Sequence, residues 1–387
     1  MSNLPLFPVS LLGSLPRPRW LIQVLRDRDA GNIPDVEWQQ LAEHAVRDAV
    51  QVQEAAGMDI VTDGEQRRDG FLTFVADRLF GLRRMSLSER IRLESDPRAT
   101  ESRLTSMDVP LNALKSPVVS DSVRILNPNK GIVLEEVDYL AQQTTRPIRV
   151  AIPGPYTLSR SIWTAAHSQR VYDSPDALGE DFATLVRDEI RQLVKRGVSV
   201  VQLDEPSIAA LTHSASESTF RGAWFPGVDD LETECASAVR LINDTFHGIQ
   251  GIERVIHISQ ANWSRTVPSA LNHDLSSVIS VLEMINVDQI NLSAALTTSG
   301  LLQAIRQFKS TKRIGLGVVS ARSDRVESVD EIVEHARTAL QHLSPEQLCL
   351  TPDTGFAPFA ERNLNTTETA QAKLSALAEA AVRLRRG

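Results

Sequence analysis

Short apolar runs alternate with longer amphipathic stretches along most of this 387-residue chain. That alternation is typical of βα units around a parallel sheet, because strands have a period near two and helices a period near 3.6. The chain could hold one large barrel or two ordinary domains, and about eight strand candidates favour a single (β/α)8 TIM barrel. The expected strands are 9–14, 59–62, 148–152, 199–203, 254–258, 289–292, 313–316 and 347–350. The expected helices are 19–29, 35–56, 175–196, 231–246, 275–284, 300–308, 328–342 and 367–385.

One region, residues 82–140, interrupts this alternation. Residues 86–106 are charged with a helical pattern, whereas residues 117–125 alternate like an exposed hairpin strand. The region lacks the apolar content for a core of its own. We therefore expect an insertion over the barrel mouth, after the second strand, within one domain that spans residues 1–387.

Charge and composition limit the partners and the compartment. The formal net charge is −8, whereas nucleic acid binding needs a basic surface, so we expect no nucleic acid partner. No apolar run approaches the ~20 residues of a membrane span, and the first residues lack the pattern of a signal peptide. Two cysteines, Cys235 and Cys349, fit a reducing cytoplasm, and we expect both thiols to be buried and inert.

Carboxylates follow three of the expected strands. Asp63 and Glu65 come after the second strand, Asp204 and Glu205 follow the fourth, and Asp353 follows the last. Burying a carboxylate is costly unless it binds a partner or takes part in chemistry. In a TIM barrel the carboxyl ends of the strands meet at one mouth. The sequence therefore predicts one acidic pocket there.

Five segments, in order along the chain, resemble the C-terminal catalytic barrel of cobalamin-independent methionine synthase, within the larger group that includes uroporphyrinogen decarboxylase. They are LGSLPR at 12–17, DGEQRRD at 63–69, IPGPYTL at 152–158, QLDEP at 202–206 and GLGVV at 315–319. Any one of them alone would be weak evidence, but together they extend over nearly the whole chain. The N-terminal half of the full-length synthase has no counterpart, so the chain is similar to the core-only members.

The resemblance implies a zinc ion that binds the substrate thiol as a thiolate. The family ligands fall at His257, Ser259, Ser293 and Thr354, so only the imidazole is retained. Neutral hydroxyls are weak zinc ligands, and we therefore expect that zinc is absent. Iron or manganese held by His257 with carboxylates is the less favoured alternative.

The resemblance also implies how an amino acid substrate would be held. It assigns the carboxylate to Ser14 with its neighbouring backbone, and the ammonium to Glu65 and Asp204. Two carboxylates facing one cation are a common way to select an amine. The alternative is that these acids form salt bridges with arginines at the barrel end (Arg17, Arg67, Arg68). The full set of predicted substrate contacts is Ser14, Arg17, Glu65, Tyr156, Trp163, Asp204, Glu205, Ser259, Ser293 and Thr354.

Four side chains are candidate catalytic groups: Glu65, Asp204, His257 and Asp353. His257 ends a strand at the same mouth as the acids, so it is either an acid, base or substrate contact, or a hydrogen-bonded core residue. Asp353 either orients His257 or caps the turn that follows it.

A folate cofactor lies beside the loop at 154–160 in the family. The tryptophan that stacks there is replaced by Ser161, although Trp163 lies two residues further on. The resemblance therefore leaves folate binding open.

These observations predict a cytoplasmic, zinc-independent enzyme of the methionine synthase type. It would transfer a methyl or alkyl group on a small substrate that bears an amino or carboxylate group. A lyase or decarboxylase that moves protons with the mouth acids is the first alternative. A catalytically silent ligand-binding barrel is the second. Both a monomer and a homodimer are compatible with the sequence.

Overall fold

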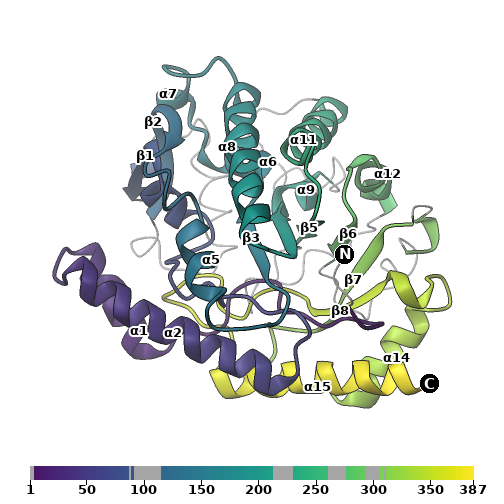
Figure 1. The fold of residues 1–387 in the computed structure, drawn as a ribbon. Helices are drawn as coiled ribbons and strands as arrows, with labels where there is room; N and C mark the ends of the chain where they lie inside the picture. Colours follow the sequence, from purple (N-terminus) through teal and green to yellow (C-terminus); the bar gives the residue numbers. More distant parts are fainter. Residues whose placement is uncertain are drawn as a thin grey trace.

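Six parallel strands form the main sheet of the protein (Figure 1). The computed structural model describes residues 4–86, 89–90, 115–211, 230–259, 276–292, 305–308 and 311–387. The strands pair in sequence order and are β3 (Arg149–Pro153), β4 (Val200–Asp204), β5 (Glu253–Ile258), β6 (Gln289–Leu292), β7 (Arg313–Val319) and β8 (Leu348–Pro352). Each pairs with the next in parallel, as expected for consecutive βα units.

Two short segments close this sheet into a cylinder. Val9 bridges Leu350 of β8, Ser10 bridges Ile60, and Val61 bridges Ile148 just before β3, all in parallel. Six strands and these two segments make the eightfold barrel, so the predicted fold class is confirmed. The first strand is shorter than the predicted 9–14, because only its first two residues form bridges.

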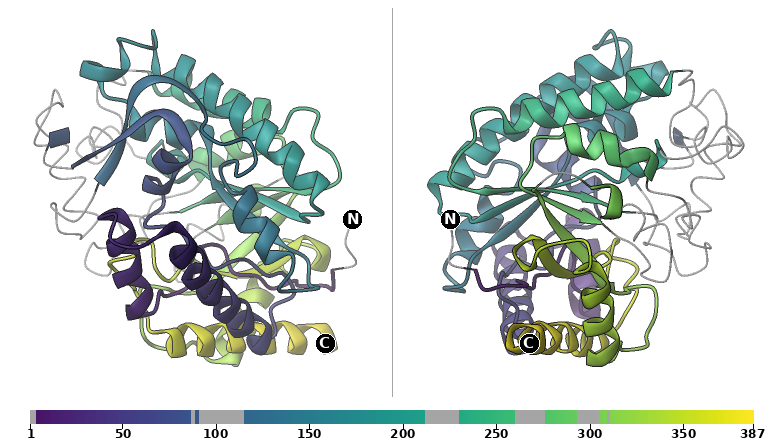
Figure 2. Two further views of the ribbon diagram at one scale, coloured as in Figure 1. Left: turned by 60° about the vertical axis from the view of Figure 1, so that its left-hand side comes forward. Right: turned by 90° about the vertical axis from the view of Figure 1, so that its right-hand side faces the viewer.

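Helices surround the sheet, with α8 and α11 on one side and α14 and α15 on the opposite side (Figure 2). Several begin at residues suited to that position: Ser174 accepts a hydrogen bond from Ala177 N–H before α8, and Ser328 forms a capping box with Glu331 before α14.

No helix in the described ranges combines the length and apolar character needed to cross a bilayer. The helices are α1 (Arg19–Asp29), α2 (Asp35–Ala56), α5 (Leu134–Leu140), α6 (Pro155–Ile162), α7 (Ala165–Ser168), α8 (Pro175–Lys195), α9 (Pro206–Ala210), α11 (Leu231–Phe246), α12 (Ser276–Met284), α14 (Val329–Ala339) and α15 (Thr367–Arg386), with 3-10 turns η1 (Thr73–Asp77) and η3 (Pro345–Gln347).

An antiparallel hairpin occupies much of the irregular region. It consists of β1 (Leu79–Ser86) and β2 (Lys115–Ile125). The hairpin strand predicted at 117–125 is therefore confirmed, whereas most of the helix predicted at 86–106 lies outside the described residues. β2 contacts α6 and α7, which follow β3, so the hairpin lies beside the carboxyl end of that strand.

The inside of the barrel is unusually polar. Barrel interiors are generally filled by branched apolar side chains, but Arg149, Gln202, Gln289 and Asn291 are all buried here. They hydrogen-bond to one another: Arg149 Nη1 and Asn291 Nδ2 donate to Gln202 Oε1 (3.1 and 3.0 Å), and Gln289 Nε2 donates to Asn291 Oδ1 (2.6 Å). Gly315 makes room for this network, because a Cβ there would lie 1.9 Å from Asn291 Oδ1.

Candidate functional site

Asp204 and His257 form the centre of the site. They lie at the carboxyl ends of the neighbouring strands β4 and β5 and are paired in register. His257 Nδ1 lies 3.0 Å from Asp204 Oδ1, and both side chains are buried, with exposed fractions of 7% and 10%. Asp204 Oδ1 also accepts a hydrogen bond of 2.7 Å from Gln202 Nε2. A carboxylate–imidazole pair held in this way can orient the ring and support proton transfer.

Glu65 reaches the same mouth from the turn after Val61. Its N–H donates to Asp63 Oδ1 (3.0 Å), and its backbone has a φ of 53°, a left-handed conformation that non-glycine residues seldom adopt. Burial raises the pKa of Glu65 to about 7, and the negative charge of Asp204 adds to that rise while Arg68 opposes it. Strained, buried residues of this kind cluster at functional sites. Glu65 and Asp204 therefore lie close enough to interact electrostatically.

The arginines beside these acids have other partners. Arg17 donates to the backbone oxygens of Ala357 (2.9 Å) and Glu65 (2.8 Å). Arg68 donates to Glu136 Oε2 (2.8 Å) and lies 3.6 Å from Glu65 Oε1, beyond a good hydrogen bond. Arg67 lies 3.9 Å from Glu43. Of the predicted salt-bridge alternatives, only the loose Arg68–Glu65 contact is present among the ion pairs of the described residues.

Ser14 joins the opening loop to the loop after β8. Its Oγ donates to Ala357 O (2.6 Å) and accepts from Ala357 N–H (3.2 Å), and its carbonyl accepts from Phe356 N–H (2.7 Å). The two loops touch so closely that a Cβ on Gly355 would lie 2.6 Å from Ser14 N. The hydroxyl is therefore committed to the fold, whereas the preceding Gly13 lies beside an acid of the mouth, since a Cβ there would lie 3.7 Å from Glu65 Oε1.

Glu205 and Tyr156 point away from the barrel axis. Both oxygens of Glu205 accept hydrogen bonds from the start of α6, from Tyr156 N–H (3.0 Å) and Thr157 N–H (2.7 Å), and burial raises the pKa of Glu205 to about 7. A Cβ on Gly154 would lie 2.1 Å from Glu205 Oε1, so only glycine allows this cap. The Tyr156 hydroxyl donates to Glu234 Oε2 in α11 (2.8 Å).

The remaining predicted residues lie around the mouth. Asp353 Oδ1 accepts from Ala321 N–H (2.8 Å) in the turn after β7, and burial raises the pKa of Asp353 to about 6. Asp353 thus caps the turn after β7, whereas the prediction named the turn that follows Asp353 itself, and Asp204 is the carboxylate that contacts His257. Ser259 is buried, while Trp163 and Thr354 are half-buried. Ser293 lies outside the described residues.

The donor set does not fit the zinc ion that the family resemblance implies. In the described part of the chain, no three His, Cys, Asp or Glu side chains are grouped to hold a metal ion. The thiol of Cys349 lies inside the barrel, 3.0 Å from Gln289 Oε1, and burial raises its pKa to about 12, which disfavours a thiolate ligand. Cys235 lies on α11 and is half-buried, not fully buried as predicted.

Sequence reasoning missed the polar residues beneath the mouth. Gln202 contacts Asp204 directly, and Arg149 and Asn291 contact Gln202. A signal was present, since residues two apart on a strand face the same side. Gln202 precedes Asp204 by two positions, so it had to share the barrel interior with that acid.

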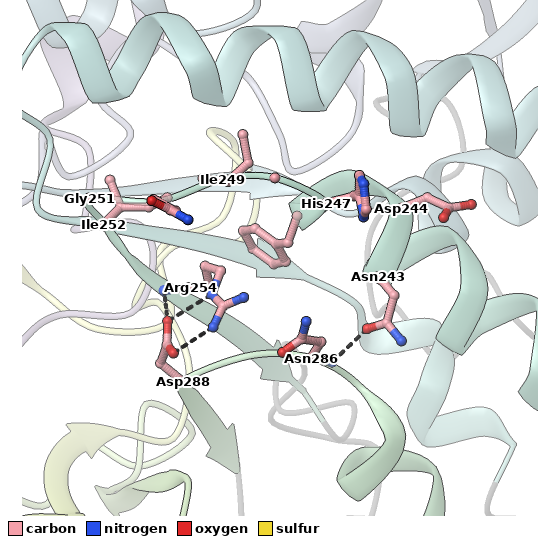
Figure 3. Close-up of a pocket in the computed structure, with 12 residues that line it drawn as sticks. Asn243, Asp244, His247, Ile249, Gly251, Ile252, Arg254, Asn286 and Asp288 are labelled. Atoms are coloured by element: carbon pink, nitrogen blue, oxygen red, sulfur yellow. Dashed lines mark hydrogen bonds and ion pairs between the residues drawn. The ribbon is translucent and has the colours of Figure 1, made fainter.

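A shallow polar pocket of about 570 Å³ lies at the opposite end of the barrel (Figure 3). It is lined by residues before β5 and β6 and at the start of β5, where Arg254 Nε and Nη2 donate to the two oxygens of Asp288 (2.9 and 2.8 Å). Asn243 Oδ1 accepts from Asn286 N–H (2.6 Å). Arg254 and Asp288 in this pocket thus neutralise each other, in contrast to the acids of the mouth.

Comparison with known proteins shows the family to which the chain belongs. The model of the cobalamin-independent synthase catalytic domain matches residues 7–221 and 265–382, leaving out the segment that contains His257 and Ser259. Curated methionine synthases of Sulfurisphaera tokodaii and Sulfolobus acidocaldarius are both 28% identical, covering 92% of this chain and 88% and 87% of theirs. A B12-independent methionine synthase of Shewanella, solved in complex with selenomethionine, matches with a TM-score of 0.71 at 22% identity, over 99% of this chain and 98% of that one. The chain therefore belongs to the cobalamin-independent synthase family and contains its catalytic domain.

Proposed function

We propose that this barrel transfers a methyl or alkyl group on a small amino-acid-like substrate, using the Asp204–His257 pair instead of zinc. Membership of a methionine synthase family supports an enzyme of methyl transfer. The single observation that carries the zinc-independent step is the 3.0 Å contact between His257 Nδ1 and Asp204 Oδ1. This contact orients the ring so that its other nitrogen can take up a proton, and the hydroxyls at the other family ligand positions are weak ligands for zinc.

The substrate ammonium would lie between Glu65 and Asp204. Without a ligand, burial and the neighbouring charge hold the pKa of Glu65 near 7, so the carboxylate is costly there. An ammonium group would offset the repulsion between the two acids and return Glu65 to its ionised form. The Shewanella protein was solved in complex with selenomethionine, which supports an amino-acid ligand for this chain as well.

His257 would act as the general base for the nucleophile. With Nδ1–H directed at Asp204, Nε2 carries the lone pair that accepts a proton. The substrate nucleophile forms a bond to the methyl carbon of an N-methyl or S-methyl donor, and the leaving group departs with the electron pair of the broken bond. The nucleophile's proton passes to Nε2. A thiol suits this step, because its ordinary pKa of about 8.5 lies within reach of an imidazole.

The other predicted contacts would shape the substrate pocket without taking part in the reaction. Glu205 would position α6, because both of its oxygens bind the start of that helix. Trp163 is half-buried at the end of α6 and packs on the core, which favours a methyl donor that does not need a stacked pterin. Ser259, Ser293 and Thr354 would add polar lining where the family has its metal.

Thermal unfolding with a matched ligand panel tests the binding step. Amino acids should raise the melting temperature, whereas the corresponding 2-hydroxy acids, which lack the ammonium, should not. Glu65→Gln should remove the effect. No shift with any amine-bearing compound would refute the ammonium site.

Mass spectrometry of products, with chelator-treated protein, tests the zinc-independent step. Methyl transfer from an N- or S-methyl donor to a thiol amino acid should survive chelation and should be lost in His257→Gln. Recovery of activity only after one equivalent of zinc is added would overturn the proposed role of His257.

A further inference from the structure

We propose that Gln202, oriented by Arg149 and Asn291, is a positioning residue that sets which ring nitrogen of His257 carries the proton. This inference rests on the proposed role of His257, although its test does not require turnover. Gln202 is fully buried inside the barrel, with an exposed fraction of 0%. A side chain with no exposed surface acts on chemistry through its partners, and of the partners of Gln202 it is Asp204 that contacts His257.

The orientation of the Gln202 amide follows from its partners. A guanidinium can only donate hydrogen bonds, so Arg149 Nη1 must face an oxygen, and that atom is Gln202 Oε1 at 3.1 Å. The amide nitrogen must then point the other way. It donates to Asp204 Oδ1 and to Leu12 O, both at 2.7 Å.

The same orientation continues along a second chain of hydrogen bonds. Because Gln202 Oε1 can only accept, Asn291 Nδ2 must donate to it (3.0 Å), and Asn291 Oδ1 then accepts from Gln289 Nε2 (2.6 Å). Gln289 Oε1 is left to accept from the Cys349 thiol (3.0 Å). The guanidinium of Arg149 is thus the anchor that fixes the direction of this network.

The orientation of Gln202 affects which nitrogen of the His257 imidazole carries the proton. Asp204 Oδ1 accepts from Gln202 Nε2, so within this network that oxygen is a hydrogen-bond acceptor. The same oxygen lies 3.0 Å from His257 Nδ1, so that nitrogen must supply the proton of their contact. The lone pair is then on Nε2. The polarity that starts at Arg149 thus selects the tautomer of His257.

Nitrogen-15 NMR of histidine-labelled, ligand-free protein measures this tautomer directly. The chain has eight histidines, and His257→Gln identifies the signal of interest by its loss. The wild-type protein should show His257 mainly as the Nδ1–H form. A dominant Nε2–H form in the wild-type protein would overturn the inference without the need for any further variant.

Two substitutions at Gln202 test the cause. Gln202→Glu keeps the shape but removes both amide donors, and Gln202→Met removes the polar group. Each should raise the Nε2–H population of His257 several-fold and lower kcat by about tenfold where turnover is measurable. Gln53→Met makes the same chemical change at a fully buried glutamine that bonds Ala49 and Thr62 instead, and should leave the His257 signal unchanged.

The outcomes separate this inference from the proposed reaction. A folded Gln202→Met protein with the wild-type His257 signal would refute the positioning role, whether or not methyl transfer occurs. The predicted tautomer together with no methyl transfer would leave the positioning role intact and refute the reaction.

Discussion

At the amino ends of the strands Arg254 and Asp288 face each other near solvent, whereas at the carboxyl ends Asp204, His257 and Glu65 lie buried. The first pair is bidentate, and each charge is neutralised by its neighbour. In the second group an acid is held at a raised pKa and a carboxylate is shared between an amide and an imidazole. The Arg254–Asp288 pair at the amino end thus satisfies its own charges, while the carboxyl end maintains costly ones, as expected where a barrel performs chemistry.

The largest expected difference between the two ends comes from one substitution made at each. Asp204→Asn should lower methyl transfer by about 10²–10⁴-fold, because the imidazole loses its carboxylate. Asp288→Asn should leave turnover unchanged and cost no more than about 1 kcal/mol of unfolding free energy, because the pair is partly exposed. Kinetics and chemical denaturation measure the two effects. Equal losses of activity would remove the functional distinction between the ends.

Glu65 should make the protein less stable as the pH rises. Its pKa is raised from 4.5 to about 7 in the folded state, so the folded protein holds a proton that the unfolded chain has released. The contribution of Glu65 is complete below pH 4.5 and is lost as the pH rises through about 7. The loss amounts to about 3 kcal/mol at most, since one pKa unit corresponds to about 1.4 kcal/mol.

Denaturation curves between pH 4.5 and 7.5 should therefore show a shallower decline in Glu65→Gln than in the wild-type protein. Glu331→Gln is the matched control. Hydrogen bonds from Ser328 lower the pKa of Glu331 to about 2, so its titration lies outside this range. An unchanged slope in Glu65→Gln would mean that Glu65 is not buried as the structure has it.

Gly315→Ala should cost about 1–3 kcal/mol, because the new methyl group would overlap Asn291 Oδ1 at 1.9 Å. The added cost should be smaller when Asn291→Ala is already present, since the clashing group is then gone. A double-mutant cycle on unfolding free energies measures this coupling. Strictly additive costs would indicate that the polar interior does not set the packing at Gly315.

The smallest effect concerns backbone strain at Glu65. Its φ of 53° costs an alanine about 1 kcal/mol but costs a glycine nothing. Glu65→Gly should therefore be about 1 kcal/mol more stable than Glu65→Ala, and both should lose the ligand-induced rise in melting temperature. If the alanine variant were the more stable one, the left-handed turn would not persist without the carboxylate.

Much of the fold could be predicted, because hydrophobic periodicity distinguishes the helices from the strands and polar residues mark where the strands end. α1, α2, α11 and β6 have the predicted bounds. The first strand was predicted too long, since an apolar sequence from 9 to 14 does not reveal that only Val9 and Ser10 find partners before the chain turns into the mouth.

The site was harder to predict, because adjacent residues at a strand end face opposite ways. Asp204 faces the barrel and His257, whereas Glu205 faces α6 and binds its first N–H groups. A motif places both acids at the mouth but does not say which one enters it. The orientation of Tyr156 depends on Glu234 in α11, a contact that no local pattern indicates.

The barrel has the fewest strand-to-strand hydrogen bonds at the junction where the two short segments close it. Only isolated bridges pair the strands there, at Val9, Ser10, Ile60 and Val61. Glu65 follows Val61 on one side of this junction, and Asp204 belongs to the well-paired sheet on the other side. A bound amine that contacts both acids would link the two sides of this junction and stabilise it. Amide protons at Val61 and Arg149, which bond across it, would then exchange with solvent more slowly once the substrate is in place.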